Sequence, residues 1–396
     1  MERSKKRDST KSILLIIDSL EKGGAQKNFL NLANYLYIKD YNIKILVTSS
    51  NLEVGYPELL NSKIEIDFLN IKKQLNLFLK LRKISEYKCE TVICFSPIIS
   101  CYLNFYNIFK RKKIKIISRC MNTLSESKKI RKNKIKEYVK ELIYKNLYFL
   151  SNKIIAQSID MQKDLIENYN ISSDKIKVIN NSLSKDYINN FFREKISLEE
   201  KKYFKNKTIA IVGRLVKQKN HVFLIYLIKK IVERGNKINL VILGKGPEEK
   251  NIRDVIKKMG LENYVFLLGA KSNPYKYIKE SNFLWLSSYY EGFPNVLLDA
   301  IFSGTVIISN DCKSGPREII SQGEQAYNDF KCFGKFKYGY LYKLDDHKKI
   351  TEEYLQELEK ILFNSEIENS NIEKNYKEIE KKYYIENQLS KYLEIL

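Results

Sequence analysis

Short apolar runs alternate with longer amphipathic stretches along the chain. The apolar runs are rich in isoleucine, leucine and valine, as in strands that are buried on both faces of a parallel sheet. The stretches between them repeat their apolar residues every three or four positions, as helices do. The predicted strands cover residues 12–18, 42–49, 64–69, 91–95, 115–118, 153–157, 175–179, 208–212, 239–243, 264–268, 283–286, 305–308 and 340–344. The alternation indicates an α/β protein with parallel sheets.

A polar segment near the middle divides the chain into two α/β halves. With 396 residues, the chain is longer than one hydrophobic core usually accommodates. Residues 186–206 are rich in Asn, Ser, Lys and Glu, which is typical of a linker. We therefore expect a first domain at residues 1–185 and a second domain at residues 207–370. A last helix, within residues 371–396, is expected to pack back on the first domain.

The most informative stretch is a strand, loop, helix and strand unit around residues 283–308. Glu291 and Gly292 end the loop, and Pro294 suits the first turn of the helix because its missing N–H costs nothing there. Gly304 is a typical end for this helix. The unit is the repeating piece of an α/β domain, and its loop lies at the carboxyl end of a strand, where such sheets bind ligands.

The polar groups of this unit follow the order of parts in a nucleotide diphosphate sugar. Glu291 lies in the loop. The backbone N–H groups of Phe293, Asn295 and Val296 leave the N-terminus of the helix and can bind a diphosphate. Asp299 lies about one turn further along the helix and can reach a sugar hydroxyl. One carboxylate, an anion site and a second carboxylate therefore follow one another.

The segment Glu291 to Ala300, EGFPNVLLDA, resembles the signature of the retaining glycosyltransferases of family four. In that family a Glu is followed eight positions later by another Glu, and here Asp299 takes the second place. Its side chain is one methylene shorter, about 1.5 Å of reach. The segment GPREII, from Gly315 to Ile320, resembles the next block of the family. The resemblance implies the GT-B fold, two Rossmann-like domains whose parallel sheets face a central cleft.

Two cations follow the first strand of the second domain. Gly213 and Arg214 begin a segment that resembles the Gly-Arg-Leu block of the same family, and Lys219 comes five positions after the arginine. An arginine and a lysine at the end of a strand can neutralise a diphosphate. Gly244 and Gly246 form a second glycine turn, which lacks the third glycine of a dinucleotide fingerprint.

The resemblance also implies roles for the individual residues. Glu291 would bind the transferred sugar, Asp299 the ribose, and Arg214 with Lys219 the diphosphate. The other donor-binding candidates lie in the loops after the strands and at the start of the helix: Gly213, Gly244, Gly246, Gly269, Gly292, Phe293, Pro294, Asn295 and Val296. No metal and no cofactor are expected. The leaving phosphate oxygen would take the proton of the acceptor.

The first domain carries the candidates for the acceptor side. Gly23 and Gly24 follow the first strand and resemble the Gly-Gly-Ala block of the family, although Gln26 and Lys27 replace its Glu and Arg. Two adjacent glycines let backbone N–H groups approach a ligand closely. Arg119 and Asn122 end a later strand and are expected to face the cleft on the acceptor side.

The chain is strongly basic, with a formal net charge of +23. Residues 128–150 combine many lysines with aromatic and aliphatic residues. Such a helix can lie on an anionic membrane, and it can equally pack on its own sheet. No run reaches the roughly 18 to 20 apolar residues needed to span a bilayer. We expect a cytoplasmic protein, peripheral on the inner face of the membrane.

Cysteine and histidine usage argues against a metal site. None of the six cysteines forms a Cys-x-x-Cys pair, and no histidine lies near them at zinc spacing. The two histidines are His221, expected on a helix surface, and His347. A reduced compartment is the default expectation for such a chain.

The first hypothesis is transfer of a hexose or N-acetylhexosamine from a nucleotide sugar, with UDP favoured. The acceptor would be lipid-linked or a saccharide, in the synthesis of surface polysaccharide, lipooligosaccharide or glycoprotein glycan. A sugar-nucleotide epimerase of similar shape is an alternative, but it would need histidine chemistry. A non-catalytic basic binding protein is a third possibility. Nucleic acid is not the expected partner, because aromatic and basic residues do not interleave in an RNA-binding signature.

Overall fold

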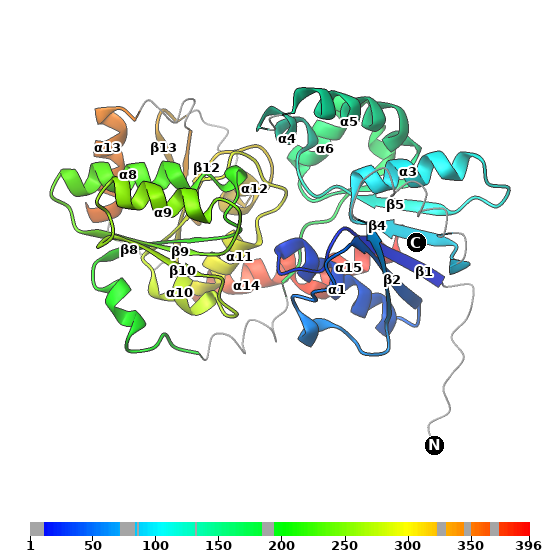
Figure 1. Ribbon diagram of the computed structural model, residues 1–396, viewed down its shortest axis with the longest axis horizontal. Helices are drawn as coiled ribbons and strands as arrows, with labels where there is room; N and C mark the ends of the chain where they lie inside the picture. The colour runs from blue at the N-terminus through cyan, green and yellow to red at the C-terminus, as the bar shows by residue number, and fades with distance from the viewer. Residues whose placement is uncertain are drawn as a thin grey trace, which may run out of the picture. The chain divides into compact units, whose positions relative to one another are not determined.

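The computed structural model divides the chain into two compact units (Figure 1). Unit 1 comprises Met1–Ser182 with Ile385–Leu396, and unit 2 comprises Leu183–Tyr384. The structure describes residues 12–71, 84, 87–130, 133–183, 194–322, 330–343, 350–364 and 372–396. Each unit is an α/β sandwich with its own sheet.

Unit 1 contains a seven-stranded sheet in the order β3-β2-β1-β4-β5-β6-β7, and all of its strand pairs are parallel. The strands are β1 (Ser12–Ile17), β2 (Asn42–Ser49), β3 (Glu65–Ile71), β4 (Thr91–Cys94), β5 (Lys115–Arg119), β6 (Lys153–Ala156) and β7 (Ile176–Val178). The helices are α1 (Gly24–Ile38), α3 (Pro97–Ile108), α4 (Leu124–Ile130), α5 (Lys134–Leu147), α6 (Ile159–Tyr169) and the C-terminal α15 (Ile385–Leu393). The strand order reverses direction between β1 and β4, the place where such sheets bind ligands.

Unit 2 repeats this order with the strands β10-β9-β8-β11-β12-β14-β13, and only β13 and β14 pair antiparallel among the described strands. The strands are β8 (Lys207–Val212), β9 (Ile238–Leu243), β10 (Val265–Gly269), β11 (Phe283–Leu286), β12 (Val306–Asn310), β13 (Phe333–Phe336) and β14 (Gly339–Tyr342). The helices are α8 (His221–Glu233), α9 (Glu249–Lys258), α10 (Tyr275–Glu280), α11 (Asn295–Ser303), α12 (Gly315–Ser321), α13 (Glu352–Glu359) and α14 (Ile372–Tyr383). The reversal here lies between β8 and β11.

The strands follow the apolar runs because both faces of each sheet are covered. Leu14, Leu15 and Ile16 of β1 are fully buried, and every residue of β9 is buried. Alternate residues of one strand therefore enter different helix layers, which is why the runs are continuous rather than alternating. In unit 2 the Trp285 indole packs 5.5 Å from the Tyr342 ring and donates a hydrogen bond to its hydroxyl.

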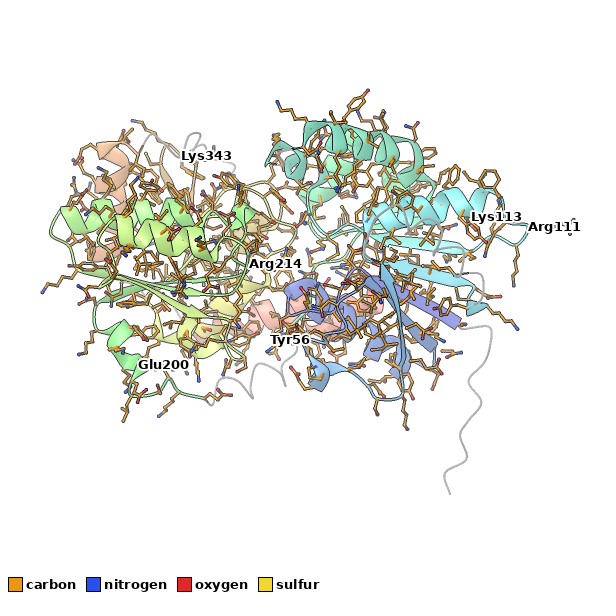
Figure 2. The ribbon with its side chains drawn as sticks, in the orientation of Figure 1. Tyr56, Arg111, Lys113, Glu200, Arg214 and Lys343 are labelled. Atoms are coloured by element: carbon orange, nitrogen blue, oxygen red, sulfur yellow. The ribbon has the colours of Figure 1, made fainter. Side chains whose placement is uncertain are left out.

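The described part of the expected linker belongs to unit 2. Ile196 is buried there, and a short 3₁₀ helix covers Glu200–Phe204. The Glu200 carboxylate, labelled in Figure 2, accepts hydrogen bonds from Lys271 (3.0 Å) and the Tyr277 hydroxyl (2.6 Å). Polar composition indicated a linker, but the few apolar residues in the segment are enough to attach it to the sheet.

The C-terminal segment contains two helices rather than one. In α14, Ile379 and Tyr383 are buried in the core of unit 2. Only α15 is part of unit 1, where Leu389 and Tyr392 join the core. The expected helix that packs back on the first domain is therefore limited to α15, and the division between the units falls after Ser182 instead of after residue 185.

Candidate functional site at the carboxyl edge of unit 2

The loops after β8 and β11 are tied together because these strands are neighbours in the sheet. The Ser287 hydroxyl donates a hydrogen bond to the carbonyl of Lys219 (2.7 Å). The Gln218 side-chain amide donates to the carbonyl of Tyr290 (2.7 Å), and the backbone N–H of Tyr289 donates back to the carbonyl of Gln218 (2.9 Å). These bonds fix one loop against the other.

The result is a close ion pair between two predicted site residues. The Lys219 ammonium lies 2.6 Å from a carboxylate oxygen of Glu291, and the Glu291 side chain is buried. Charge-assisted hydrogen bonds of this length are stronger than those between neutral groups. Because a buried charge is costly without its partner, each residue holds the other in place. Sequence reasoning assigned both residues to the donor without predicting their contact.

Arg214 differs from Lys219 although both follow the same strand. Its side chain is exposed, and its guanidinium has no hydrogen-bond or ion-pair partner among the described residues (Figure 2). At Gly213, an added Cβ would lie 3.3 Å from the side chain of Lys219. The glycine therefore leaves room for the lysine to run along the loop towards Glu291.

The glycines after β9 and β10 have backbone roles in the structure. Gly244 has φ +151°, and a Cβ added there would lie 1.8 Å from the carbonyl oxygen of Gly213. At Gly246 an added Cβ would lie 2.4 Å from the carbonyl oxygen of Leu215. Gly269 turns the chain at φ +72°, and its carbonyl accepts the N–H of Gly244 (2.9 Å). These residues allow three loops to pack closely at the edge of the sheet.

The two segments that resemble family blocks pack directly on each other. The carbonyl of Gly292 accepts hydrogen bonds from the N–H of Gly315 (3.0 Å) and from the Ser314 hydroxyl. An added Cβ at Gly315 would lie 2.9 Å from the Cα of Phe293, so a side chain does not fit there. Ser314 has φ +105°, a conformation that is rare for residues other than glycine. The start of α12 is thereby held against the loop before α11.

Helix α11 begins at Asn295, one residue later than predicted. Pro294 takes the N-cap position with φ −74° and ψ 103°, and no side chain caps the helix. Without a side-chain cap, the first-turn N–H groups of Asn295 and Val296 remain oriented out of the helix, as an anion site requires. The Phe293 side chain is buried and lies 5.4 Å from the Tyr383 ring. Asp299 is half-buried on the second turn of the helix.

His221 is buried, which corrects the expectation of a surface position. Burial, together with the positive charge of Lys219, lowers the pKa of its imidazole to about 4. Its Nε2 has no hydrogen-bond partner among the described residues. His221 is the first residue of α8, and it lies on the face of this helix that packs on the sheet. Its position directly after a polar loop suggested an exposed residue.

Two further groups near the ion pair were not singled out from the sequence. Cys312 is buried, and burial together with the negative charge of Glu291 raises the pKa of its thiol well above the ordinary value. This thiol therefore stays protonated and unreactive. Arg317 forms a bidentate ion pair with Asp311, with 2.9 Å between Nε and one carboxylate oxygen. The sequence signal that could have identified Arg317 was its place in the Gly-Pro-Arg-Glu block.

In unit 1, the glycine pair begins a helix as predicted. Gly23 is the N-cap of α1 and Gly24 its first residue, and the carbonyl of Gly23 accepts the N–H of Lys27 (3.1 Å). An added Cβ at Gly23 would lie 2.4 Å from the amide oxygen of Gln26, so that side chain folds back over the glycine. Lys27 itself is buried.

Arg119 has a different environment from the one expected. The side chain is buried, and its guanidinium donates hydrogen bonds to the Tyr392 hydroxyl (2.5 Å) and to the side-chain oxygen of Asn181 (2.8 Å). The C-terminal helix α15 covers it, which corrects the prediction that it faces a cleft. Asn122 is half-buried, and its carbonyl accepts a hydrogen bond from the Cys120 thiol (3.2 Å).

A carboxylate missed by sequence reasoning lies at the carboxyl edge of the first sheet. Asp18 directly follows β1, and the hydroxyls of Ser96, after β4, and Thr48, in β2, donate hydrogen bonds to it. The side chain reaches solvent, yet the surrounding protein atoms raise the pKa of its carboxyl, and the two hydroxyls oppose that rise. Its position after the central strand was the signal that could have identified it.

Comparisons with known proteins point to one family. A family model described as Glycosyl transferases group 1 matches residues 192–377. An uncharacterized glycosyltransferase of Methanocaldococcus jannaschii is 34% identical over 205 residues, which cover 51% of this chain and 50% of that protein. The chain thus spans about half the length of this relative.

A second relative is matched over most of its length. The Campylobacter jejuni N-acetylgalactosamine-N,N'-diacetylbacillosaminyl-diphospho-undecaprenol 4-alpha-N-acetylgalactosaminyltransferase is 29% identical over 324 residues, 78% of this chain and 83% of its own. Among solved structures, Anabaena HepE in complex with UDP-glucose has a TM-score of 0.73 at 15% sequence identity, covering 97% of this chain and 100% of that one. The likeness confirms the predicted fold class of two Rossmann-like domains with parallel sheets.

Proposed function

Because the chain belongs to the group 1 glycosyltransferases, we propose that it transfers a hexose or N-acetylhexosamine from a UDP sugar, with retention at the anomeric carbon. The acceptor is a lipid-linked or saccharide hydroxyl, in surface polysaccharide, lipooligosaccharide or glycoprotein glycan synthesis. The observation that carries this proposal is the cation-rich carboxyl edge of unit 2. There the Lys219–Glu291 pair, the exposed Arg214 and the start of α11 belong to adjoining loops of one sheet.

The donor diphosphate is held by Arg214, Lys219 and the first N–H groups of α11. The acceptor oxygen forms a bond to the anomeric carbon while the bond from that carbon to the diphosphate breaks. The leaving UDP gains negative charge in this step, and preorganised cations and N–H groups stabilise it most at that moment. A leaving phosphate oxygen takes the acceptor proton. In this proposal the protein cations supply the charge that a metal supplies elsewhere, and no cofactor takes part.

The two carboxylates divide the rest of the donor between them. Glu291 contacts the transferred sugar and orients Lys219, with which it forms an ion pair at 2.6 Å. Asp299, on the second turn of α11, accepts hydrogen bonds from the ribose. The remaining donor residues shape the loops: Gly213, Gly244, Gly246, Gly269, Gly292, Phe293 and Pro294.

The acceptor side is assigned to the carboxyl edge of unit 1. Gly23 and Gly24 form the N-terminus of α1, and Asn122 lies in the loop after β5. Asp18 adds a carboxylate held by two hydroxyls, a group suited to accept a hydrogen bond from a sugar hydroxyl. The acceptor is membrane-bound in the proposed setting, so the enzyme works as a peripheral protein on the inner face of the cytoplasmic membrane.

Two observations bear on the substrate and the location. The name of the Campylobacter relative describes a transferase that acts on a diphospho-undecaprenol glycan, and HepE was solved with UDP-glucose. No helix in the described ranges combines the length and the apolarity needed to cross a bilayer. The substrates of the two relatives support a nucleotide sugar and a lipid-linked acceptor in this proposal.

The experiment that tests this function is a donor screen. Purified protein is incubated with a panel of UDP- and GDP-sugars, and slow release of the nucleotide in the absence of acceptor is measured together with transfer to added acceptors. A transferase releases UDP from one donor and keeps the anomeric configuration in the product. An epimerase converts the donor without releasing UDP, and a binding protein does neither. If a chelator abolishes the activity and added metal restores it, the metal-free mechanism is contradicted.

A further inference from the structure

Helix α5 of unit 1 presents an apolar face to solvent. Ile135 is 79% exposed, Tyr138 60%, Val139 49% and Leu142 44%. Their spacing of three, four and seven positions places them on one side of the helix. A stripe of this kind normally faces the core of a globular protein, so its exposure needs an explanation.

The opposite side of the same helix packs on the core of unit 1 through Ile143, Tyr144 and Leu147, and it also carries paired charges. Glu137 is buried, and its carboxylate lies 3.2 Å from the Lys140 ammonium. Glu141 is half-buried and pairs with Lys145 (3.3 Å) and with Lys128 of α4. The helix thus pairs its acidic groups with neighbouring lysines and packs one apolar set on the core, while a second apolar set, the stripe described above, stays outside.

Exposed apolar residues are concentrated around this helix. Of the 15 large apolar side chains that are exposed in the described part of the chain, nine lie between residues 105 and 150. Phe105, Ile108 and Phe109 belong to the end of α3, whose Asn104 side chain donates a hydrogen bond to the carbonyl of Leu147 at the end of α5 (2.8 Å). The two helices are therefore packed neighbours.

The same region is strongly basic. Residues 105–150 contain 14 Lys and Arg against three Glu, a net charge of +11 out of the chain's +23. Arg111 and Lys113, labelled in Figure 2, are exposed after α3, and Lys134 and Lys136 are exposed beside Ile135. Each of the three glutamates lies within salt-bridge distance of a lysine. The free charge around the apolar stripe is positive.

We propose that unit 1 docks on an anionic phospholipid surface through the outward face of α5 and the adjoining end of α3. Ile135, Tyr138, Val139 and Leu142 enter the boundary between headgroups and acyl chains, while the lysines beside them stay at the phosphate level. This deepens the proposed peripheral location and is independent of the donor sugar. A lipid surface is favoured over a protein partner because the basic residues are spread along both α3 and α5 and are not gathered in a single pocket.

The first arm of the test removes the apolar contact. The full-length protein is sedimented with phosphatidylcholine vesicles that contain about a third phosphatidylglycerol, a surface negative enough to attract basic residues. The double variant Ile135→Ser with Leu142→Ser should bind at least about tenfold more weakly, because two apolar side chains no longer enter the bilayer. Leu198→Ser is the control, since Leu198 is exposed in unit 2 and should not change binding.

The second arm removes charge only. Lys134→Gln with Lys136→Gln should weaken binding about tenfold at low salt and by much less at high salt, because screening removes the attraction. Lys201→Gln with Lys202→Gln, two exposed lysines of unit 2, is the matched control and should bind like the wild type. All variants should release UDP from the donor at the wild-type rate, which separates this test from that of the proposed function.

Three outcomes overturn the proposal. The wild type does not sediment with phosphatidylglycerol vesicles, or the serine variants bind as tightly as it does. In the third outcome the wild type is dimeric in solution and the serine variants are monomeric, so the stripe is an interface between copies. Unchanged circular dichroism of every variant ensures that a loss of binding reflects the surface and not the fold.

Discussion

The two sheets share a strand order but differ in the chemistry at their carboxyl edges. In both, the first strand is third in the sheet, and a loop containing glycine connects it to the following helix. In unit 2 the loops carry the Lys219–Glu291 ion pair and an exposed arginine. In unit 1 the corresponding edge carries Asp18 with two hydroxyls. The topology offers each unit the same place for a ligand, and the loop residues decide which ligand would suit it.

Two arginines at the ends of strands sharpen this contrast. Arg214 follows β8 and is exposed, whereas Arg119 ends β5 and is buried against Tyr392 and Asn181. Their sequence contexts looked alike. The difference comes from α15, which covers Arg119, and it means that a cation after a strand is accessible to a ligand only where the chain leaves it uncovered.

The largest effect is expected at Glu291. Glu291→Ala removes the contact to the transferred sugar at the reacting centre. Turnover should fall by about a hundredfold to a thousandfold, as when a preorganised group at a reacting centre is lost. Steady-state kinetics with the donor found in the screen measure the change. Glu318→Ala, a carboxylate of α12, is the control, and equal losses in both variants would contradict the assigned role.

Arg119→Ala should destabilise the folded protein without affecting nucleotide binding. The substitution leaves buried partners of the guanidinium unsatisfied and should lower the free energy of unfolding by about 3 kcal/mol. Urea unfolding measures the loss, and UDP titration of the folded variant measures affinity. Weaker UDP binding with unchanged stability would reverse the contrast between the two arginines.

His221 predicts a pH dependence of stability. Its pKa is about 4 in the folded protein, because burial and Lys219 disfavour the imidazolium, and 6.5 is the ordinary value. Above pH 6.5 the group is neutral in both states. As the pH falls towards 4 only the unfolded chain takes up the proton, so the free energy of unfolding should drop by about 3 kcal/mol.

The variant His221→Asn isolates this contribution from that of the carboxylates, which also titrate in acid. The pH dependence of its unfolding free energy should be flatter than that of the wild type between pH 6.5 and 4.5. Urea unfolding at several pH values gives both curves. Parallel curves would show that His221 is not held neutral by its surroundings.

A smaller effect is expected at Asp299. Asp299→Ala should weaken UDP binding about tenfold, because one charged acceptor of the ribose hydroxyls is lost. Asp299→Asn should fall between the wild type and Asp299→Ala, and Asp299→Glu should keep or improve the affinity. Calorimetry with UDP compares them with Glu291→Ala, which should bind free UDP normally. The opposite pattern would mean that the two carboxylates are reversed.

Local patterns predicted most of the fold because both sheets are buried on both faces. The strands around Leu14 and Leu240 read as continuous apolar runs, and Gly304 ends α11 at φ 69° as expected. The antiparallel strand β13 was missed, since it is only four residues long and a glycine and a lysine interrupt its apolar pattern. The helix break between Tyr383 and Ile385 was missed because the amphipathic pattern continues through it.

The candidate site was predictable as a set of residues but not as a set of contacts. Their places after strands and the family resemblance gave Glu291 and Lys219, whereas their ion pair depends on β8 and β11 being neighbours in the sheet. Arg119 was misplaced because the helix that covers it comes more than 250 residues later in the chain. Asp18 was overlooked because its hydroxyl partners come from two other strands, which only the topology brings together.

The central claim is that Arg214 and Lys219 bind the diphosphate of the donor. Isothermal titration of UDP into the wild type, Arg214→Ala, Lys219→Ala and Lys217→Ala tests it directly. Lys217 is an exposed lysine of the same short helix as Lys219, so it controls for a general loss of positive charge. Arg214→Ala and Lys219→Ala should each weaken binding about tenfold to a hundredfold, and Lys217→Ala should not. Equal affinity in all four proteins, or equal losses in the three variants, would contradict the claim.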